Sequence, residues 1–413
     1  MSIFQAADLL IPRETDLPDW AVIACDQFTS QPEYWRAVRE QAEGKPSAYH
    51  IVFPEAELGR AEDERIFSIH ACMRRYLEAG IFRSFPASYV YVERALLDGG
   101  IRRGIVGVID LESYDYHSST LAPIRATEQT VVERIPPRVR VREDAPLELS
   151  HVMLLMDDAE GAVLDSLTTV WDRLPLVYDF KLMQGGGRIT GRLVSGADAE
   201  ALDRAVEAYE AQAVMRYAPT GKAPLLYTAG DGNHSLATAK ACWEALKRQD
   251  PALAGTAHPA RYAMVELQNI RDEVQRFEPI HRILTDVDVP ALLDAAASLC
   301  APEGSPVAWY AGDAHGELML DTDSGALPVA VLQPFLDVWL LGHKGAIDYI
   351  HGDEVAVSLA KQPNALAFLL PNIAKEDFFH GIVMDGVLPR KTFSMGHAQE
   401  KRYYLECRRI QGE

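Results

Sequence analysis

The residues best suited to chemistry lie in segment 224–240, where the chain reads PLLYTAGDGNHSLATAK. An apolar run typical of a strand is followed by Gly230, Asp231 and Gly232, and then by a pattern typical of a helix. The first turn of a helix has backbone N–H groups without intrahelical partners and the positive end of the helix dipole. This layout therefore predicts an anion site.

The side chains of residues 230–235, which we call the signature loop, supply further chemistry. Gly230 and Gly232 lack a Cβ atom, which lets a ligand approach the backbone closely. Asp231 is a candidate metal ligand or proton acceptor, and His234 is a candidate proton donor or acceptor. Because Asp, Gly and Asn also build ordinary tight turns, a plain strand-to-helix turn is the alternative interpretation.

The signature loop resembles the motif of the domain-of-unknown-function 1015 family, whose commoner form is Ala-Asp-Gly-His-His-Arg before an alanine-rich helix. This chain departs from that form at two positions, where Asn233 replaces the first His and Ser235 replaces the Arg. A phosphate contact made by that Arg is absent here. The Ser235 hydroxyl could bind phosphate or Mg²⁺ in its place, or Ser235 could simply favour the start of a helix.

Further segments resemble the same family, in the same order along the chain. They are Cys25-Asp26-Gln27-Phe28 with residues 31–35, residues 102–108 with 125–130, Pro279-Ile280-His281-Arg282, and Leu388-Pro389-Arg390-Lys391-Thr392. On these residues the chain is identified as a member of the family. The resemblance adds Glu128 and His281 as candidate acid–base groups, and Arg125, Arg282 and Lys391 as candidate cations.

The motif is also similar to the phosphate-binding motif of the ParB/sulfiredoxin fold, which includes nucleotide hydrolases, sulfiredoxins and nucleotide-dependent kinases of free serine. This similarity implies a ParB/sulfiredoxin-like element around the loop and an enzyme that transfers or hydrolyses a phosphoryl group. Such a site needs anion donors, cations or Mg²⁺, and a base, because its catalysis is mostly positioning and electrostatic stabilisation.

We accordingly expect Mg²⁺, with Asp231 as its ligand, a nucleotide (ATP or ADP), and a small polar metabolite, with serine or phosphoserine as the first candidate. The expected catalytic residues are Asp231, His234, His281 and Glu128. The expected binding residues are Gly230, Gly232, Asn233, Ser235, Arg282, Arg125 and Lys391. Two alternatives remain: a metal-assisted hydrolase with Asp26, Asp231 and His234 as ligands, and a non-catalytic sensor of small anions or nucleotides.

Composition excludes other classes of protein. The formal charge of the 413-residue chain is −20, which disfavours general nucleic-acid binding. The densest basic run contains Arg134, Arg138, Arg140 and Arg142 and is followed by acidic residues, so we expect a solvated strand face. Five cysteines without a CxxC pair indicate neither a disulfide framework nor a zinc ribbon. Without a signal-peptide pattern or an apolar run of about 20 residues, we expect a cytoplasmic protein that does not enter membranes.

The patterns along the chain predict an α+β fold, in which a mixed sheet is flanked by helices. Helical patterns cover residues 32–43, 61–79 and 199–217, and strand patterns cover 89–94, 103–110 and 261–267. We expect a domain boundary near residue 215, which would separate an N-terminal α+β region (residues 1–215) from an α/β region (216–413) that carries the signature loop; the alternative is a single intertwined unit. The oligomeric state does not follow from the sequence.

Overall fold

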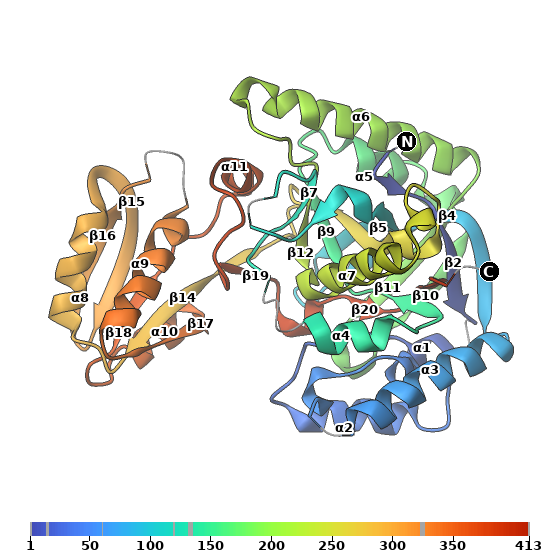
Figure 1. The fold of residues 1–413 in the computed structure, drawn as a ribbon, viewed down its shortest axis with the longest axis horizontal. Coiled ribbons are helices and arrows are strands. Elements are labelled where there is room, and N and C mark those ends of the chain that lie inside the picture. The colour runs from blue at the N-terminus through green and yellow to red at the C-terminus, as the bar shows by residue number, and fades with distance from the viewer. Residues whose placement is uncertain are drawn as a thin grey trace. The chain divides into compact units, whose positions relative to one another are not determined.

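The computed structural model describes residues 2–13, 16–59, 61–118, 120–130, 135–322 and 327–411, which form two compact units (Figure 1). Unit 1 contains Met1–Ala126, Thr130–Gln275 and His397–Glu413, and unit 2 contains Thr127–Gln129 and Arg276–Gly396. The expected α+β class is confirmed, because helices and mixed or antiparallel sheets occur in both units.

The units do not divide at the expected position near residue 215. That position lies inside helix α6 (Ala197–Tyr217), in the middle of unit 1. Strand β12 (Tyr227–Asp231), which follows α6, pairs with β9 (Met153–Met156), which precedes it. Chain segments from both sides of residue 215 thus share one sheet and one core, so a cut there would separate hydrogen-bonded strands.

The described residues of unit 1 build a 13-stranded mixed sheet. Its remaining strands are β1 (Phe4–Gln5), β2 (Ala7–Pro12), β4 (Phe82–Ala95), β5 (Ile101–Asp110), β6 (Tyr114–Asp115), β7 (Ile124–Ala126), β8 (Leu147–Leu149), β10 (Leu176–Lys181), β11 (Arg188–Val194), β13 (Tyr262–Asn269) and β21 (Cys407–Arg409). The main path runs β6-β7-β12-β9-β13-β5-β4-β2-β21-β8, while β1 pairs with β5 and β11 pairs with both β4 and β10.

Helices cover both faces of this sheet (Figure 1). They are α1 (Leu17–Trp20), α2 (Pro32–Ala42), α3 (Glu62–Glu78), α4 (Ile135–Arg142), α5 (Ala162–Thr168), α6 and α7 (Asn233–Gln249). Side chains alternate along β4, so Val90 faces the core shared with α1 to α3, whereas Tyr89 and Tyr91 face the core shared with α5 to α7. The sheet therefore separates two hydrophobic cores.

The expected strand in the basic run is wrong for residues 135–142, which form helix α4, while Arg134 lies outside the described residues. The arginines of α4 form ion pairs on several sides: Arg138 with Glu55, Arg140 with acidic residues at the start of α3, and Arg142 with Glu148. A helix distributes successive side chains around its axis, which these separate partners require, whereas a strand would place Arg138, Arg140 and Arg142 on one face.

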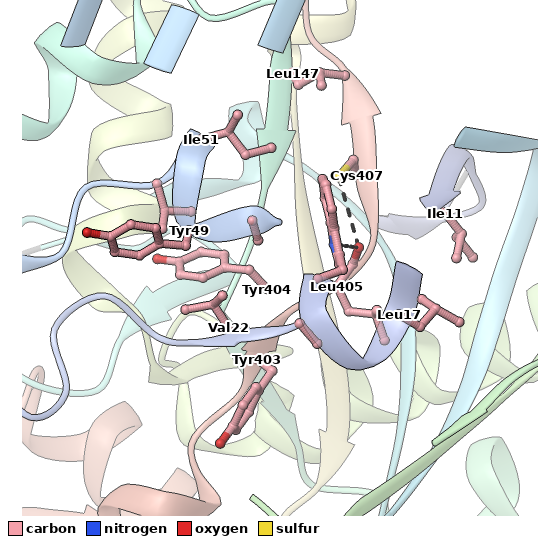
Figure 2. Packing of buried hydrophobic residues seen from close by; sticks show 14 of the residues in the cluster. Ile11, Leu17, Val22, Tyr49, Ile51, Leu147, Tyr403, Tyr404, Leu405 and Cys407 are labelled. Carbon is pink, nitrogen blue, oxygen red and sulfur yellow. Dashed lines mark hydrogen bonds between the residues drawn. The ribbon is translucent and has the colours of Figure 1, made fainter. Parts of the chain in front are cut away.

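The C-terminal segment of unit 1 packs into the core formed by N-terminal residues. Strand β20 (Tyr403–Tyr404) pairs with β3 (Val22–Ile23), and Trp20 Nε1 donates a hydrogen bond of 3.0 Å to the Leu405 carbonyl. Figure 2 shows Tyr404 between Val22 and Tyr49. These contacts fix the position of residues near the chain end that, as shown below, belong to the candidate site.

Unit 2 contains a six-stranded antiparallel sheet in the part of the chain that the structure describes. Its strands are β14 (Phe277–Thr285), β15 (Cys300–Ala311), β16 (Ala314–Leu320), β17 (Ala346–His351), β18 (Leu366–Leu369) and β19 (Phe393–Met395), and its helices are α8 (Val289–Ala296), α9 (Pro328–Gly342), α10 (Asp353–Leu359) and α11 (Lys375–Asp385). In neither unit is any described helix long and apolar enough to cross a membrane.

Candidate functional site

The signature loop has the strand–turn–helix geometry that the sequence predicts. Strand β12 ends at Asp231, Gly232 adopts a φ of +79°, and α7 begins at Asn233. A Cβ atom on Gly232 would lie 2.9 Å from the Cα of Val152 and 3.4 Å from the Cδ2 of His151. The loop thus lies directly against the segment that precedes β9, and only glycine fits at this position.

Asp231 is held by contacts within unit 1. One carboxylate oxygen accepts a hydrogen bond of 2.8 Å from the Gly232 N–H, and the other lies 3.1 Å from Lys401 Nζ. Both side chains are largely buried, with exposed fractions of 15% for Asp231 and 11% for Lys401. The loop therefore combines a carboxylate and an ammonium group at the start of a helix.

Asp26 is a second carboxylate in this region. Burial alone would raise the pKa of Asp26, but the charge of His151, the amide of Gln27 and the charges of Lys401 and Arg138 outweigh burial and lower it. Asp26 is consequently ionised at neutral pH. A carboxylate kept ionised by surrounding cations is a suitable cation ligand and a weak general base.

Tyr404 connects this charged cluster to Cys25. The Tyr404 hydroxyl lies 2.8 Å from His151 Nδ1 and donates to Cys25 Sγ over 3.1 Å. Burial and the nearby Asp26 raise the pKa of Cys25 to about 11, and burial raises the pKa of Tyr404 well above its ordinary value. Both groups are protonated at neutral pH, which argues against thiolate chemistry at Cys25.

A cavity of about 120 Å³ lies beside these groups. Cys25, His151, Ser235 and Tyr404 line it, together with Arg138 and a set of apolar side chains. Ser235, which replaces the arginine of the commoner family motif, therefore borders space that a ligand could occupy.

The structure divides the candidate residues from the sequence between the two units. Unit 1 contains Arg125 and the whole signature loop, with Gly230, Gly232, Asn233, His234 and Ser235 as well as Asp231. Unit 2 contains Glu128, His281, Arg282 and Lys391.

Arg125 forms contacts that hold the fold of unit 1. Its guanidinium donates to the carbonyl oxygens of Ala122, Ala223 and Pro224 over 2.9 to 3.2 Å, and its side chain is buried. These carbonyls occupy the donors that a phosphate would need. We therefore do not include Arg125 in the candidate site.

His281 and Arg282 have similar structural contacts in unit 2. Nδ1 of His281 accepts a hydrogen bond from the Leu370 N–H, so Nε2 is the nitrogen that donates to Asp353 over 2.8 Å. The buried guanidinium of Arg282 donates to Gln333 Oε1 and to backbone carbonyls, including that of Lys391 at 2.8 Å. Both side chains thus connect β14 to neighbouring segments.

Glu128 organises the segment that contains Lys391. Its carboxylate accepts hydrogen bonds from the backbone N–H groups of Lys391, Thr392 and Phe393 over 2.9 to 3.4 Å. Burial raises the pKa of Glu128, although these donors oppose the shift. Lys391 itself is exposed and has a positive φ of 56°. These residues form a tight turn of unit 2 through backbone contacts.

Sequence reasoning missed four residues of the cluster: Arg138, His151, Lys401 and Tyr404. They come from three segments of the chain, with Lys401 and Tyr404 in the same one, and no spacing pattern joins them to the signature loop. The one available signal was the resemblance around Cys25 and Asp26. Among the described residues, no group of three or more His, Cys, Asp and Glu side chains is arranged to hold a metal ion.

Comparison with solved structures found distant similarities. "SbnI with C-terminal truncation from Staphylococcus aureus" is 9% identical, with 70% of this chain and 82% of that chain covered and a TM-score of 0.36. A conserved hypothetical protein from Pyrococcus furiosus is 12% identical (72% and 93% covered, TM-score 0.34). A free serine kinase in complex with AMP is 12% identical (74% and 90% covered, TM-score 0.37). At these TM-scores the similarities carry no conclusion about this chain.

No curated protein matches the chain. A family model described as "Protein of unknown function (DUF1015)" matches residues 7–408, which is nearly the whole chain. This match confirms the resemblance seen in the signature loop and the other four elements. The chain belongs to the DUF1015 family.

Proposed function

We propose that unit 1 binds a phosphoryl group at the start of α7 and transfers it to, or removes it from, a small polar metabolite. The observation that carries this proposal is the ion pair of Asp231 and Lys401 at the start of α7, beside a cavity, with Asp26 close enough for the Lys401 charge to lower its pKa. The proposal includes that the signature loop is a ParB/sulfiredoxin-like phosphate-binding element.

Each group has a role in that chemistry. The backbone N–H groups of the first turn of α7 would bind phosphate oxygens, and Lys401 would neutralise part of their charge. Asp231 and Asp26 offer the carboxylate oxygens that Mg²⁺ prefers. Mg²⁺, when bound, would neutralise the charge that develops on the phosphate oxygens.

The transfer step needs one proton acceptor. In the direction of transfer, an acceptor oxygen forms a bond to phosphorus while the bond from phosphorus to the bridging oxygen of the nucleotide breaks. The electron pair of that bond stays on the nucleotide, and the acceptor's proton passes to Asp231. The Cys25 thiol, with its pKa of about 11, does not take part as a thiolate.

The experiment has two parts. Thermal unfolding of the full chain is measured with ATP, ADP, AMP, phosphate, serine and phosphoserine, each with and without Mg²⁺. Turnover is then followed by the transfer of labelled phosphate to serine. A ligand at a hundredfold excess over its Kd stabilises the native state by about 2.7 kcal/mol, which a melting curve detects.

The proposal expects a Mg²⁺-linked nucleotide shift in the wild type that is lost in Asp231→Asn and Lys401→Met. Lys222→Met, at an exposed lysine in a loop of the same unit, is the matched control and should keep the shift. No shift with any phosphate compound would overturn the proposal. Binding without turnover of serine or of any other small metabolite would instead identify a non-catalytic sensor.

A further inference from the structure

The cavity beside the signature loop is too small for a nucleotide. Its volume is about 120 Å³. Because a cavity of about 150 Å³ can hold one benzene ring, this one has room for about five or six non-hydrogen atoms. A nucleobase or a sugar phosphate exceeds that size. Whatever fills the cavity is therefore a smaller molecule than the proposed phosphoryl donor.

The walls of the cavity are mainly apolar. Val52, Phe53, Met73 and Leu147 line it, and they belong to the hydrophobic core that α1 to α3 cover. An aliphatic segment placed here would be removed from water, which favours its binding. The middle of a well-suited ligand is thus a short carbon chain.

A buried group of charges with a net positive charge borders the cavity. Glu148 lies 2.8 Å from Arg142 Nη1 and 2.5 Å from Arg408 Nε, so two cations share one anion. Burial would raise the pKa of Glu148, but Arg142 and Arg408 outweigh burial and lower it, which keeps this carboxylate ionised.

Arg142 and Glu148 both line the cavity, and Glu148 is already paired with two arginines, so Arg142 is the lining group of this set that has capacity for a further acceptor. The Nε and Nη2 groups of Arg408 donate to Glu148 and to the carbonyls of Pro259 and Tyr262. In contrast, the buried Nη2 of Arg142 has no hydrogen-bond partner in the part of the chain that the structure describes. A buried donor without a partner is costly, and a ligand carboxylate near it would supply the missing acceptor and balance the charge.

Polar groups of the candidate site also line the cavity. Ser235, His151 and Tyr404 offer hydroxyl and imidazole groups there, and Arg138, which also lines the cavity, is already balanced by Glu55. These polar groups suit a ligand hydroxyl group. The lining is therefore complementary to a ligand that has an anionic group, a short aliphatic segment and a hydroxyl group.

We propose that this cavity binds a short aliphatic hydroxy acid, with its carboxylate beside Arg142 and its hydroxyl beside Ser235 and His151. Its role as phosphoryl acceptor rests on the proposed function, whereas its binding does not. Titration calorimetry of the full chain tests the binding, with 3-hydroxypropionate as the probe and uncharged 1,3-propanediol as its matched control compound.

We expect 3-hydroxypropionate to bind at least about tenfold more tightly than the diol. Arg142→Gln should weaken acid binding by about tenfold or more. Arg140→Gln, at an exposed arginine of the same helix that does not line the cavity, should leave it unchanged. Ala145→Leu should abolish binding by filling the cavity, and if it does not fold, Val141→Ile fills part of the same space.

Equal binding of acid and diol, or unchanged acid binding in the folded cavity-filling variant, would overturn this inference. Asp231→Asn separates it from the proposed function. In that variant acid binding should persist while the nucleotide shift disappears. Acid binding without any nucleotide shift in the wild type would refute the proposed reaction and leave the hydroxy-acid site standing.

Discussion

Replacement of Gly232 by alanine tests whether the signature loop is built against the segment that carries His151. The φ of +79° costs alanine about 1–2 kcal/mol. The new Cβ would also lie 2.9 Å from the Cα and 3.0 Å from the Cγ2 of Val152, and such overpacking costs about 1–3 kcal/mol. We expect the free energy of unfolding to fall by about 2–5 kcal/mol in total.

The matched control is Gly221→Ala. Gly221 has a φ of +66°, and a Cβ atom there would have no neighbour within 4 Å, so only the backbone cost of about 1–2 kcal/mol applies. Urea unfolding, followed through the tryptophans of unit 1, gives both values. If the two variants lose equal stability, the close contact between Gly232 and Val152 does not exist in solution. The argument that the loop and the His151 segment form one site would then be refuted.

Three further predictions concern buried groups. Cys25 should react with iodoacetamide far more slowly than exposed Cys300 at neutral pH, as peptide mapping will show, because a thiol with a pKa of about 11 has roughly a hundredth of the thiolate of an ordinary one. Arg282→Met should lower the free energy of unfolding of unit 2 by about 3 kcal/mol or more by leaving buried carbonyls unpaired, whereas exposed Lys391→Met should change it by less than about 0.5 kcal/mol. Glu148→Gln should cost about 3–5 kcal/mol at pH 7, because it leaves two buried arginines without their anion. Since the folded-state pKa of Glu148 is lowered, its stabilising contribution is present above its unfolded pKa and is lost as the pH falls through the folded value, so the deficit measured by urea unfolding should shrink with acidification.

Local patterns predicted most elements of the fold. The helical spacing in residues 32–43 and 61–79 corresponds to α2 and α3, and the apolar run in 261–267 corresponds to β13. The strand predicted for the basic run at residues 138–142 was wrong, because ion-pair partners that are distant in sequence lie on several sides of this segment and favour a helix. The predicted domain boundary near residue 215 differs from the observed units for a related reason. The pairing of β12 with β9 continues one sheet across residue 215, and local sequence patterns do not reveal such long-range pairing.

The candidate site was only partly predictable. The glycines, Asp231 and the helix start were visible because they are contiguous and follow local backbone rules. Lys401 and Tyr404 could not be found this way, because they reach the loop only through the packing of the C-terminal segment against N-terminal residues. Arg125 and Arg282 show a different difficulty: the sequence predicts each as a phosphate ligand, and in the structure their guanidinium groups donate mainly to backbone carbonyls, which no local pattern indicates.

The position of Lys401 depends on a buried framework around the C-terminal segment. Arg94, which is 2% exposed, donates to the carbonyls of Gln399, Glu400 and Lys401, and Arg102 donates to that of Glu400. Burying two arginines is costly unless they find hydrogen-bond acceptors, and these carbonyls accept from the Nη groups, whereas the Nε of each has no partner among the described residues. The same bonds fix the backbone from which Lys401 reaches Asp231. The buried arginines are thus part of what fixes the geometry of the candidate site. Because they hold the C-terminal segment in place, Lys401 can serve as the cation of the site although it is far in sequence from Asp26.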